Sequence, residues 1–513
     1  MGIPSYFKRL TDTVRGLLSP SIQSKVSCLL VDFNCIVYGC LRSDALLPYT
    51  TEESGVWEHS LNEEVCKSLV KLWEAAGRPT KVYIAVDGVV PMAKIKQQRM
   101  RRFKSVWWAE KEYEMGVRKR GVDRWDTNAI TPGTAYMEHL GRRLQDLCSA
   151  RGWTVSTSDE PGEGEHKVME WLRRGNVKED DGSIVIYGLD ADLILLSMLT
   201  CVKYSSVFLM REKSEFGKEA AKFGSAPFLF FSVKHLLGVL CASVERQTEF
   251  IIDYIAIMSL LGNDFLPHGL TLKIRDGGHD WLLAQLRATH KNGKRFVNED
   301  QLINYDTFRE LFGILAQSEE THLMDSIFKK KTTRPMAART DTERLMMSVQ
   351  GLPIEWFVEK EFLDRGELSS DWQSVYHRHT PVEACSEYLH GIQWIVDYYI
   401  GKKVNMMWYY PWHLPPLWAD LSLYTQNMYE KEVEEPALKP QEQLAIVLPM
   451  ESWHLLRDPR LRRLPTLAPQ FWPTKYGFMT LGKTWMWECE ADIPILTPGR
   501  LRSLLKNLTP PIL

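Results

Sequence analysis

Three short apolar runs near the start of the chain each carry an aspartate where a strand would end, and this recurrence limits the possible folds more than any other feature. The runs are KVSCLLVDFN with Asp32, KVYIAVDGVVP with Asp87, and SIVIYGLDAD with Asp190 and Asp192. Segments with helical periodicity separate them, so strands and helices alternate over residues 1–290. This alternation predicts an α/β domain with a largely parallel sheet flanked by helices.

The position of these aspartates points to a binding site. In open α/β sheets, ligands bind at the carboxyl ends of the strands. A single aspartate there could instead cap the next helix, and each one taken alone leaves that alternative open. Burying an ionised carboxylate is costly without a positive partner, so Asp190 and Asp192 call for an arginine, a helix N-terminus or a metal.

More acids occur at other element ends. Glu163 and Glu165 lie in DEPGEGEHKVMEWL, where a turn opens an amphipathic helix, and Asp264 follows the apolar helix FIIDYIAIMSLLG. Favourable placement near a helix dipole is the simpler explanation for the two glutamates. Convergence of all these acids would require hard divalent cations, which prefer oxygen ligands. Two such ions about 3.5–4 Å apart hydrolyse phosphodiesters, one by activating water and the other by stabilising the leaving oxygen. We therefore predict two Mg²⁺ ions, replaceable by Mn²⁺, and seven ligands: Asp32, Asp87, Glu163, Glu165, Asp190, Asp192 and Asp264.

A basic segment, PMAKIKQQRMRRFK, follows Asp87 closely and contains no acid. Pro91 suits the first turn of a helix. Residues at spacings i, i+4, i+7 and i+8 share one face of such a helix, and this face can bind a terminal phosphate. A solvated basic helix is the alternative. The residues of this face that we predict to bind a terminal phosphate are Lys94, Gln98, Arg101 and Arg102.

Composition and sequence pattern argue against a membrane-bound or disulfide-rich protein. The formal net charge is −2, there is no apolar run long enough to span a membrane, and Tyr6 occupies the position where myristoylation needs Ser or Thr. The nine cysteines form no C-x-x-C pair. We therefore expect reduced thiols in an intracellular protein with no membrane association, cytoplasmic rather than nuclear.

The ordered motifs resemble the XRN family of 5′→3′ exoribonucleases. MGIPSYFKRL, VDFNCIVYGC, VDGVVPMAKIKQQRMRRF, ITPGTAYM, PGEGEHKVM, YGLDADLILL and LLGNDFLP are similar to its first block, and YLHGIQWIVDYYI, WYYPWHLPPL and QEQLAIVLP to its second. The resemblance implies a PIN/FEN-like nuclease core with a mixed, mainly helical C-terminal block. It also implies that the seven acids are the metal ligands and that the four helix residues form the 5′-phosphate pocket.

The resemblance also suggests how the chain is divided. Residues 1–290 would form the metal-dependent nuclease domain, and 371–513 a second block that packs on the active site. Between them, 291–370 is a divergent helical or linker region in which we expect 317–348 to be exposed. The long C-terminal extension of the large cytoplasmic members is not seen, so we expect a catalytic core alone.

Two aromatic residues are candidates for stacking the first base. Tyr38 stands where the family has a histidine, and it can stack but cannot carry an imidazolium charge. The family usually has two tryptophans before YYP, and this chain has only Trp408. We assign Trp408 as the second stacking residue, with core packing as the alternative.

One segment has the spacing of a nucleotide-binding P-loop but not its surroundings. GFMTLGKT, residues 477–484, has the Walker A spacing, but aromatic and acidic residues surround it and no helix of useful length fits before Pro494. A working P-loop needs a strand before it and a helix after it. We expect no nucleotide site there.

The sequence thus predicts a processive 5′→3′ exoribonuclease. It would hydrolyse single-stranded RNA with a 5′-monophosphate to nucleoside 5′-monophosphates by a two-metal-ion mechanism. A flap-type endonuclease shares the acidic sheet, but its glycine-rich helix–turn–helix is poorly matched by FLPHGLTLKIRDGGHD. A non-catalytic RNA-binding scaffold, the other alternative, would tolerate the loss of ligands. Protein partners cannot be inferred from the sequence.

Overall fold

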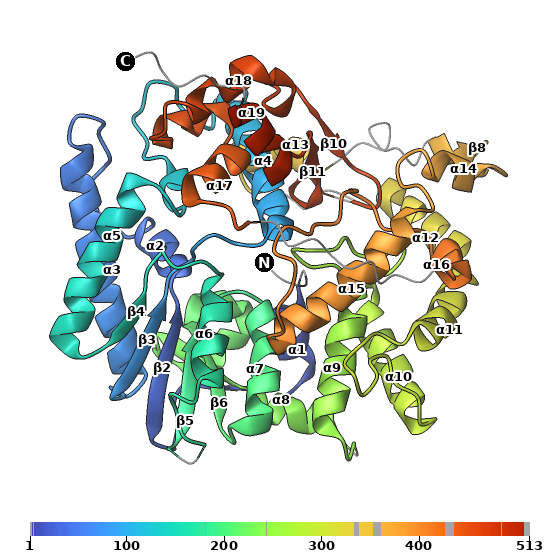
Figure 1. Cartoon of the computed structure of the whole chain (residues 1–513), viewed down its shortest axis with the longest axis horizontal. Coiled ribbons are helices and arrows are strands. Elements are labelled where there is room, and N and C mark those ends of the chain that lie inside the picture. The colour runs from blue at the N-terminus through green and yellow to red at the C-terminus, as the bar shows by residue number, and fades with distance from the viewer. Residues whose placement is uncertain are drawn as a thin grey trace.

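A seven-stranded sheet organises the first half of the chain (Figure 1). The structure, a computed structural model, describes residue 3 and residues 5–179, 181–242, 244–332, 338–351, 361–425, 436–483 and 485–506. The strand order is β1-β7-β6-β5-β2-β3-β4, and only β7 pairs antiparallel, with the edge strand β1 on one side and with β6 on the other. The predicted α/β class with a largely parallel sheet is therefore confirmed. The strands are β1 Leu18–Ser19, β2 Val26–Asp32, β3 Lys81–Ala85, β4 Thr154–Ser156, β5 Ser183–Tyr187, β6 Val207–Glu212 and β7 Phe228–Ser232.

Both faces of the sheet are buried, which is why the strands read as continuous apolar runs. Successive side chains of a strand point to opposite faces. On β2, Leu29 and Val31 pack with helices α3 (Ser54–Ala75) and α5 (Ala135–Arg151). Cys28 and Leu30 pack in a second core with α6 (Gly164–Arg173) and α7 (Asp192–Lys203). Helices therefore cover the sheet on both sides (Figure 1).

The strand order places the predicted site. β2 and β5 are neighbours, but the chain continues from β2 toward β3 and β4 and from β5 toward β6 and β7. The carboxyl ends of β2 and β5 therefore form the topological switch point of the sheet, where open α/β folds bind their ligands. Asp32 ends β2, and Asp190 lies in the loop after β5.

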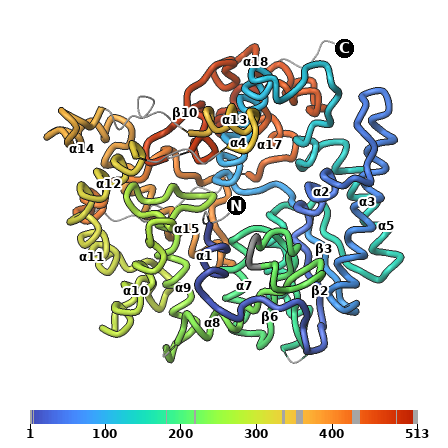
Figure 2. Tube along the Cα trace, turned by 180° about the vertical axis from the view of Figure 1, so that it is seen from behind, coloured from blue at the N-terminus to red at the C-terminus, as the bar shows by residue number. Residues whose placement is uncertain are grey.

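Helix α4 (Met92–Glu114) leaves the sheet and enters the C-terminal part of the molecule. Its apolar residues Ile95, Met100 and Phe103 share a core with α17 (Pro440–Val447) and β11 (Glu490–Asp492). Figure 1 and, from behind, Figure 2 show α4 among these late elements. The basic segment of the sequence is therefore a helix of the first block that packs against the second block rather than a solvated surface helix.

Three cations of α4 bind backbone carbonyls of the second block instead of facing solvent. Arg99 is fully buried and supplies three of these hydrogen bonds. Because a buried carbonyl without a donor is costly, these side chains fix the C-terminal block around α4. The donors and acceptors are Lys96 to Tyr410 and Trp412, Arg99 to Ile446, Phe471 and Pro494, and Lys104 to Trp487 and Cys489.

The remaining elements are mostly helical, as expected for the C-terminal half. Residues 317–348, expected to be an exposed connector, contain two helices: α12 buries Leu323 and Ile327, whereas no side chain of α13 is buried. The other helices are α1 Tyr6–Thr13, α2 Asn34–Cys40, α8 Val233–Leu240, α9 Gln247–Met258, α10 Gly278–Lys291, α11 Tyr305–Ala316, α12 Glu319–Thr332, α13 Asp341–Gln350, α14 Trp372–Tyr376, α15 Ala384–Ile400, α16 Trp418–Leu423, α18 Leu464–Leu467 and α19 Pro498–Lys506. Short strands are β8 Leu363–Asp364, β9 Glu367–Leu368 and β10 Gly477–Met479.

The segment with Walker A spacing lies in a hairpin. β10 pairs antiparallel with β11, and a short 3₁₀ turn, Met486–Glu488, lies between them. Among the residues that the structure describes after β10, the first α-helix is α19. The strand–loop–helix context of a P-loop is therefore missing from this part of the chain. Residue 484 lies outside the described ranges.

Replacing Arg99 with methionine should destabilise the protein strongly. Methionine keeps the apolar contacts but leaves three buried carbonyls without a donor, each costing roughly 1–3 kcal/mol. We expect Arg99→Met to lower the free energy of unfolding by about 3 kcal/mol or more. The matched control is Arg101→Met, an exposed position on the same helix, where the change should be within about 0.5 kcal/mol. Urea unfolding measures both, and equal midpoints would contradict the anchoring role.

Candidate metal centre

Asp32 and Asp87 lie on either side of the N-terminus of α6. The backbone N–H of Gly164 donates to Asp87 Oδ1 at 2.7 Å. A Cβ atom on Gly164 would lie 2.5 Å from Asp32 Oδ1 and 3.4 Å from Asp87 Oδ1. Only glycine fits at this position, so the turn GEGE in the sequence is required by the approach of the two strand-end acids.

Lys94 joins acids from two separate parts of the chain. Its Nζ lies 2.8 Å from Glu163 Oε2 and 2.6 Å from Asp264 Oδ2. Burial alone would lower the pKa of Lys94, but the charges of Asp264 and Glu163 outweigh it and raise that pKa well above its usual value. The same ammonium lowers the pKa of Asp264 despite burial. Lys94 is therefore a charged internal cation between two predicted metal ligands.

The other predicted acids interact electrostatically with Lys94, Glu163 or Asp264, and with one another. Burial raises the pKa of Asp32 well above its usual value, and the charges of Asp87 and Asp190 raise it further. Burial is also the main cause of the raised pKa of Glu165, against the opposing effect of Lys94. The structure thus brings all seven predicted acids together, and we call them the acidic cluster: Asp32, Asp87, Glu163, Glu165, Asp190, Asp192 and Asp264.

Asp192 is the member that most requires a cation. Its side chain is buried, and neither carboxylate oxygen makes a hydrogen bond of full geometry with the residues that the structure describes, although the Tyr399 hydroxyl interacts with it. Burial, followed by the charge of Asp264, raises its pKa from 3.8 to about 7. Buried charges persist in proteins when they are paired or coordinate metals. An oxygen-only cluster with such a carboxylate fits Mg²⁺ or Mn²⁺.

His166 belongs to the same site and was not among the predicted residues. Ligand atoms of Glu163, Glu165 and His166 all lie within 4.8 Å of one another. Burial lowers the pKa of His166 well below its usual value, which keeps the imidazole neutral. In the sequence, only its position directly after Glu165 indicates that His166 belongs to the site.

Arg211 is a second residue that sequence reasoning missed. Its guanidinium is buried over the ring of Phe7 and donates to the backbone carbonyl of Asp190 at 2.8 Å. This contact holds the loop that carries Asp190 against β6. An arginine inside the apolar strand VFLMRE was the signal, since such a residue needs an acceptor.

The predicted phosphate-binding face of α4 is only partly available to a ligand. Arg102 is buried and donates to Asn128 Oδ1 at 3.0 Å and to Thr131 Oγ1 at 2.8 Å, while Arg101 is exposed. Gln98 Oε1 is buried with no hydrogen-bond partner in the described part of the chain. Lys94, the fourth residue of this face, is engaged by the acidic cluster.

The two predicted stacking residues differ in exposure. Tyr38 on α2 is 42% exposed, and its hydroxyl interacts electrostatically with Arg102. Trp408 is 7% exposed, donates from Nε1 to Glu387 at 3.0 Å, and packs 5.3 Å from the ring of Trp394. Core packing, the alternative for Trp408, therefore describes its surroundings. Base stacking by Trp408 stays a prediction, and it would require the ring to leave this packing.

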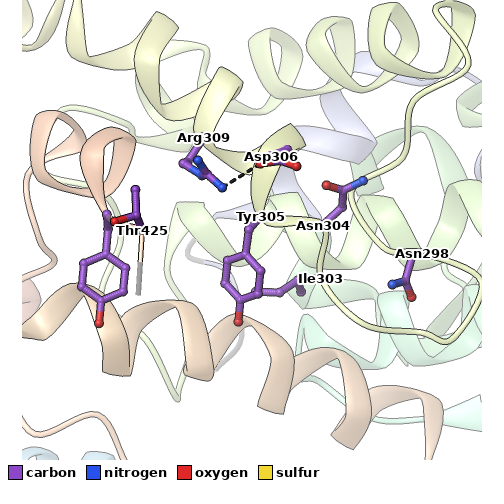
Figure 3. Close-up of a pocket in the computed structure, with 8 residues that line it drawn as sticks. Asn298, Ile303, Asn304, Tyr305, Asp306, Arg309 and Thr425 are labelled. Atoms are coloured by element: carbon purple, nitrogen blue, oxygen red, sulfur yellow. Dashed lines mark hydrogen bonds and ion pairs between the residues drawn. The ribbon is translucent and has the colours of Figure 1, made fainter. Parts of the chain in front are cut away.

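A separate polar pocket lies in the helical half of the molecule (Figure 3). Its volume is about 390 Å³, and it contains none of the predicted site residues. The lining residues are Asn298, Ile303, Asn304, Tyr305, Asp306, Arg309, Tyr424 and Thr425.

Two general features concern the cysteines and the apolar helices. All nine cysteines are free thiols. Among the described residues, no helix combines the length and the apolar character that a membrane crossing requires.

Comparison with known families identifies the chain. A sequence model described as "XRN 5'-3' exonuclease N-terminus" matches residues 1–213, and one described as "Xrn1 helical domain" matches residues 245–351 and 368–512. The chain belongs to the XRN family. The helical-domain match begins before residue 290 and includes Asp264, so the acidic cluster draws residues from both matched regions.

Individual XRN proteins are similar over nearly the whole chain. "5'-3' exoribonuclease 1" of Homo sapiens is 26% identical across 99% of this chain and 34% of its own length. "5'-3' exoribonuclease 2" of Debaryomyces hansenii is 25% identical across 99% of this chain and 70% of its own length. The Saccharomyces cerevisiae "5'-3' exoribonuclease 1" is 24% identical across 99% of this chain and 44% of its own length. The chain thus spans between about a third and about two thirds of these relatives.

Among solved structures, a similar chain is "The catalytic core of Rad2 in complex with DNA substrate (complex III)". It is 14% identical with a TM-score of 0.33, covering 81% of this chain and 91% of that chain.

The stability of the metal-free protein should fall as the pH rises, because of Asp192. An aspartate whose pKa is raised from 3.8 to about 7 holds its proton in the folded state but not in the unfolded chain between these values. Its contribution to stability is fully present below the lower value and is lost as the pH rises through the higher one. Divalent metal binds the ionised form, so Mg²⁺ should raise the Tm more at about pH 8 than at about pH 5.5.

Differential scanning calorimetry with and without Mg²⁺ measures this difference. In Asp192→Asn the metal-free protein should be more stable than wild type at about pH 8, and the rise with Mg²⁺ should shrink. An equal rise with Mg²⁺ at both pH values would contradict the interpretation.

Proposed function

We propose that this XRN protein is a metal-dependent 5′→3′ exoribonuclease. The observation that carries the proposal is the acidic cluster at the switch point of the sheet, balanced by Lys94 from the helix that also bears Gln98, Arg101 and Arg102. A cluster of this charge suits hydrolysis of a phosphodiester, and the cationic face beside it suits a terminal phosphate.

The acidic cluster would hold two Mg²⁺ ions, with Mn²⁺ able to replace them. Such ions activate water for attack and stabilise the leaving oxygen of a phosphodiester. Lys94 supports the assignment, since its ammonium already lies where positive charge is needed, 2.6 Å from Asp264 and 2.8 Å from Glu163. Divalent cations at these acids would release Lys94, which can then turn toward the RNA phosphate.

The face of α4 would select the 5′ end. Arg101 is exposed, Arg102 is oriented by Asn128 and Thr131, and Gln98 Oε1 has no hydrogen-bond partner among the described residues. Guanidinium groups bind phosphate through paired, charge-assisted hydrogen bonds. A site formed by these residues would accept one phosphate and reject the bulk of a cap or triphosphate.

The chemistry also supports processive action on single-stranded RNA. Hydrolysis that releases a nucleoside 5′-monophosphate leaves a 5′-phosphate on the shortened RNA, which is the group that the pocket binds. Tyr38 would stack the first base, since stacking is tolerant of sequence and its ring is exposed. Trp408 would have to leave its packing to contribute, so we propose Tyr38 alone. The nine free thiols support an intracellular, cytoplasmic location.

Arg101→Ala should reduce activity on 5′-monophosphate RNA about ten- to a hundred-fold, because each charge-assisted hydrogen bond contributes roughly 1.5–3 kcal/mol. The loss should be far smaller on RNA with a 5′-hydroxyl, where the contact is never made. The measurement compares wild type and variant on both ends of otherwise identical labelled RNA. Equal losses on the two substrates would mean that α4 binds the RNA backbone in general.

Asp192→Asn should abolish cleavage while the protein remains folded, because removing one buried negative charge relieves repulsion but disables the metal site. End-labelled linear RNA in Mg²⁺ reports the activity, and EDTA should have the same effect on wild type. Full activity of the variant would exclude the two-metal mechanism. Cleavage of circular RNA by wild type would favour the endonuclease alternative.

A further inference from the structure

Tyr398 is a residue of the second block that reaches into the acidic cluster. It lies near the C-terminal end of α15 and is buried. Its hydroxyl donates to Glu163 Oε1 at 2.9 Å, and Glu163 Oε2 lies 2.8 Å from Lys94 Nζ. The two oxygens of this carboxylate therefore have different partners, a neutral phenol on one and a cation on the other.

The phenol stays a hydrogen-bond donor. A tyrosine hydroxyl ordinarily loses its proton only near about pH 10, so it is protonated at neutral pH. A neutral hydroxyl can donate to Glu163 Oε1 without competing for the place of a cation. Glu163 Oε2 is thereby left as the oxygen that is free to face positive charge.

The ring of Tyr398 is held on several sides. It stacks on His166 with centroids 3.7 Å apart and planes at 25°, and it lies 4.7 Å from Trp394 and 5.8 Å from Phe265. His166 follows Glu165, and Phe265 follows Asp264. Tyr398 therefore contacts Glu163 itself and packs against the residues that follow Glu165 and Asp264. This close packing leaves its hydroxyl little freedom to move.

We propose that Tyr398 is a positioning residue for metal binding, through which the second block sets the orientation of the Glu163 carboxylate. The inference rests on the proposed metal-dependent function. Partners that orient metal ligands typically change metal affinity 10- to 100-fold when they are removed. Without the hydroxyl, the Glu163 carboxylate can rotate, so the oxygen facing the metals is no longer fixed.

The test is Mn²⁺ binding to the full chain, followed by the electron paramagnetic resonance signal of free Mn²⁺. Tyr398→Phe keeps the ring and should weaken Mn²⁺ binding about 10- to 100-fold. The control is Tyr376→Phe, which removes an equally buried hydroxyl that donates to the carbonyl of Pro415 at 2.5 Å. Its Mn²⁺ affinity should match that of wild type, even if both variants lose similar thermal stability.

A double mutant separates positioning from packing. Because Tyr398 acts through Glu163, Tyr398→Phe should have almost no further effect on Mn²⁺ affinity in a Glu163→Gln background. An independent loss in that background, or unchanged affinity of Tyr398→Phe alone, overturns the inference while leaving the metal-dependent function in place. A wild-type chain that binds no Mn²⁺ overturns both.

Discussion

Repulsion among seven converging carboxylates, five of them buried, is the constraint on which the rest of the structure depends. The seven acids come from five element ends, and the fold brings these ends together although burial and mutual charge raise the pKa of several members. Two like charges at close range in a low dielectric repel strongly. A fold that maintains such a cluster needs positive charge at its centre, and Lys94 supplies one part of it.

Helix α4 connects this charge balance to the architecture. At its start Lys94 neutralises acids of the sheet domain, and further along Arg99 binds carbonyls of the second block. Tyr398 makes the reverse connection, from the second block back to Glu163. The two halves of the chain therefore complete one site, which explains why the residues around the acidic cluster come from distant parts of the sequence.

Much of this arrangement could be predicted from the sequence because it depends on local patterns. Strand-end aspartates and buried apolar runs indicate a parallel sheet with a site at its carboxyl edge, and the convergence of Asp32, Asp87 and Asp190 follows from that topology. Helix spacing placed Gln98 and Arg101 on one face. Neither pattern says which of the other cations on α4 would be buried under the second block.

The features that were missed depend on tertiary contacts. Trp408 and Tyr38 are both aromatic residues in family motifs, but only packing against Trp394 makes Trp408 a core residue. His166, Arg211 and Tyr398 act through partners far away in the sequence, and no periodicity reveals such pairs. Buried polar residues in apolar segments were the only signal, because each of them requires a partner.

The most direct test of the account is the number of Mn²⁺ ions bound per chain and their competition with Lys94. Calorimetric titration of wild type should give two ions per chain, with protons released on binding. Lys94→Met should bind Mn²⁺ at least as tightly, because no internal ammonium then has to be displaced. Loss of Mn²⁺ binding in a folded Lys94→Met protein, or no stoichiometric uptake by wild type, would contradict the central claim that the acidic cluster is a divalent-cation site.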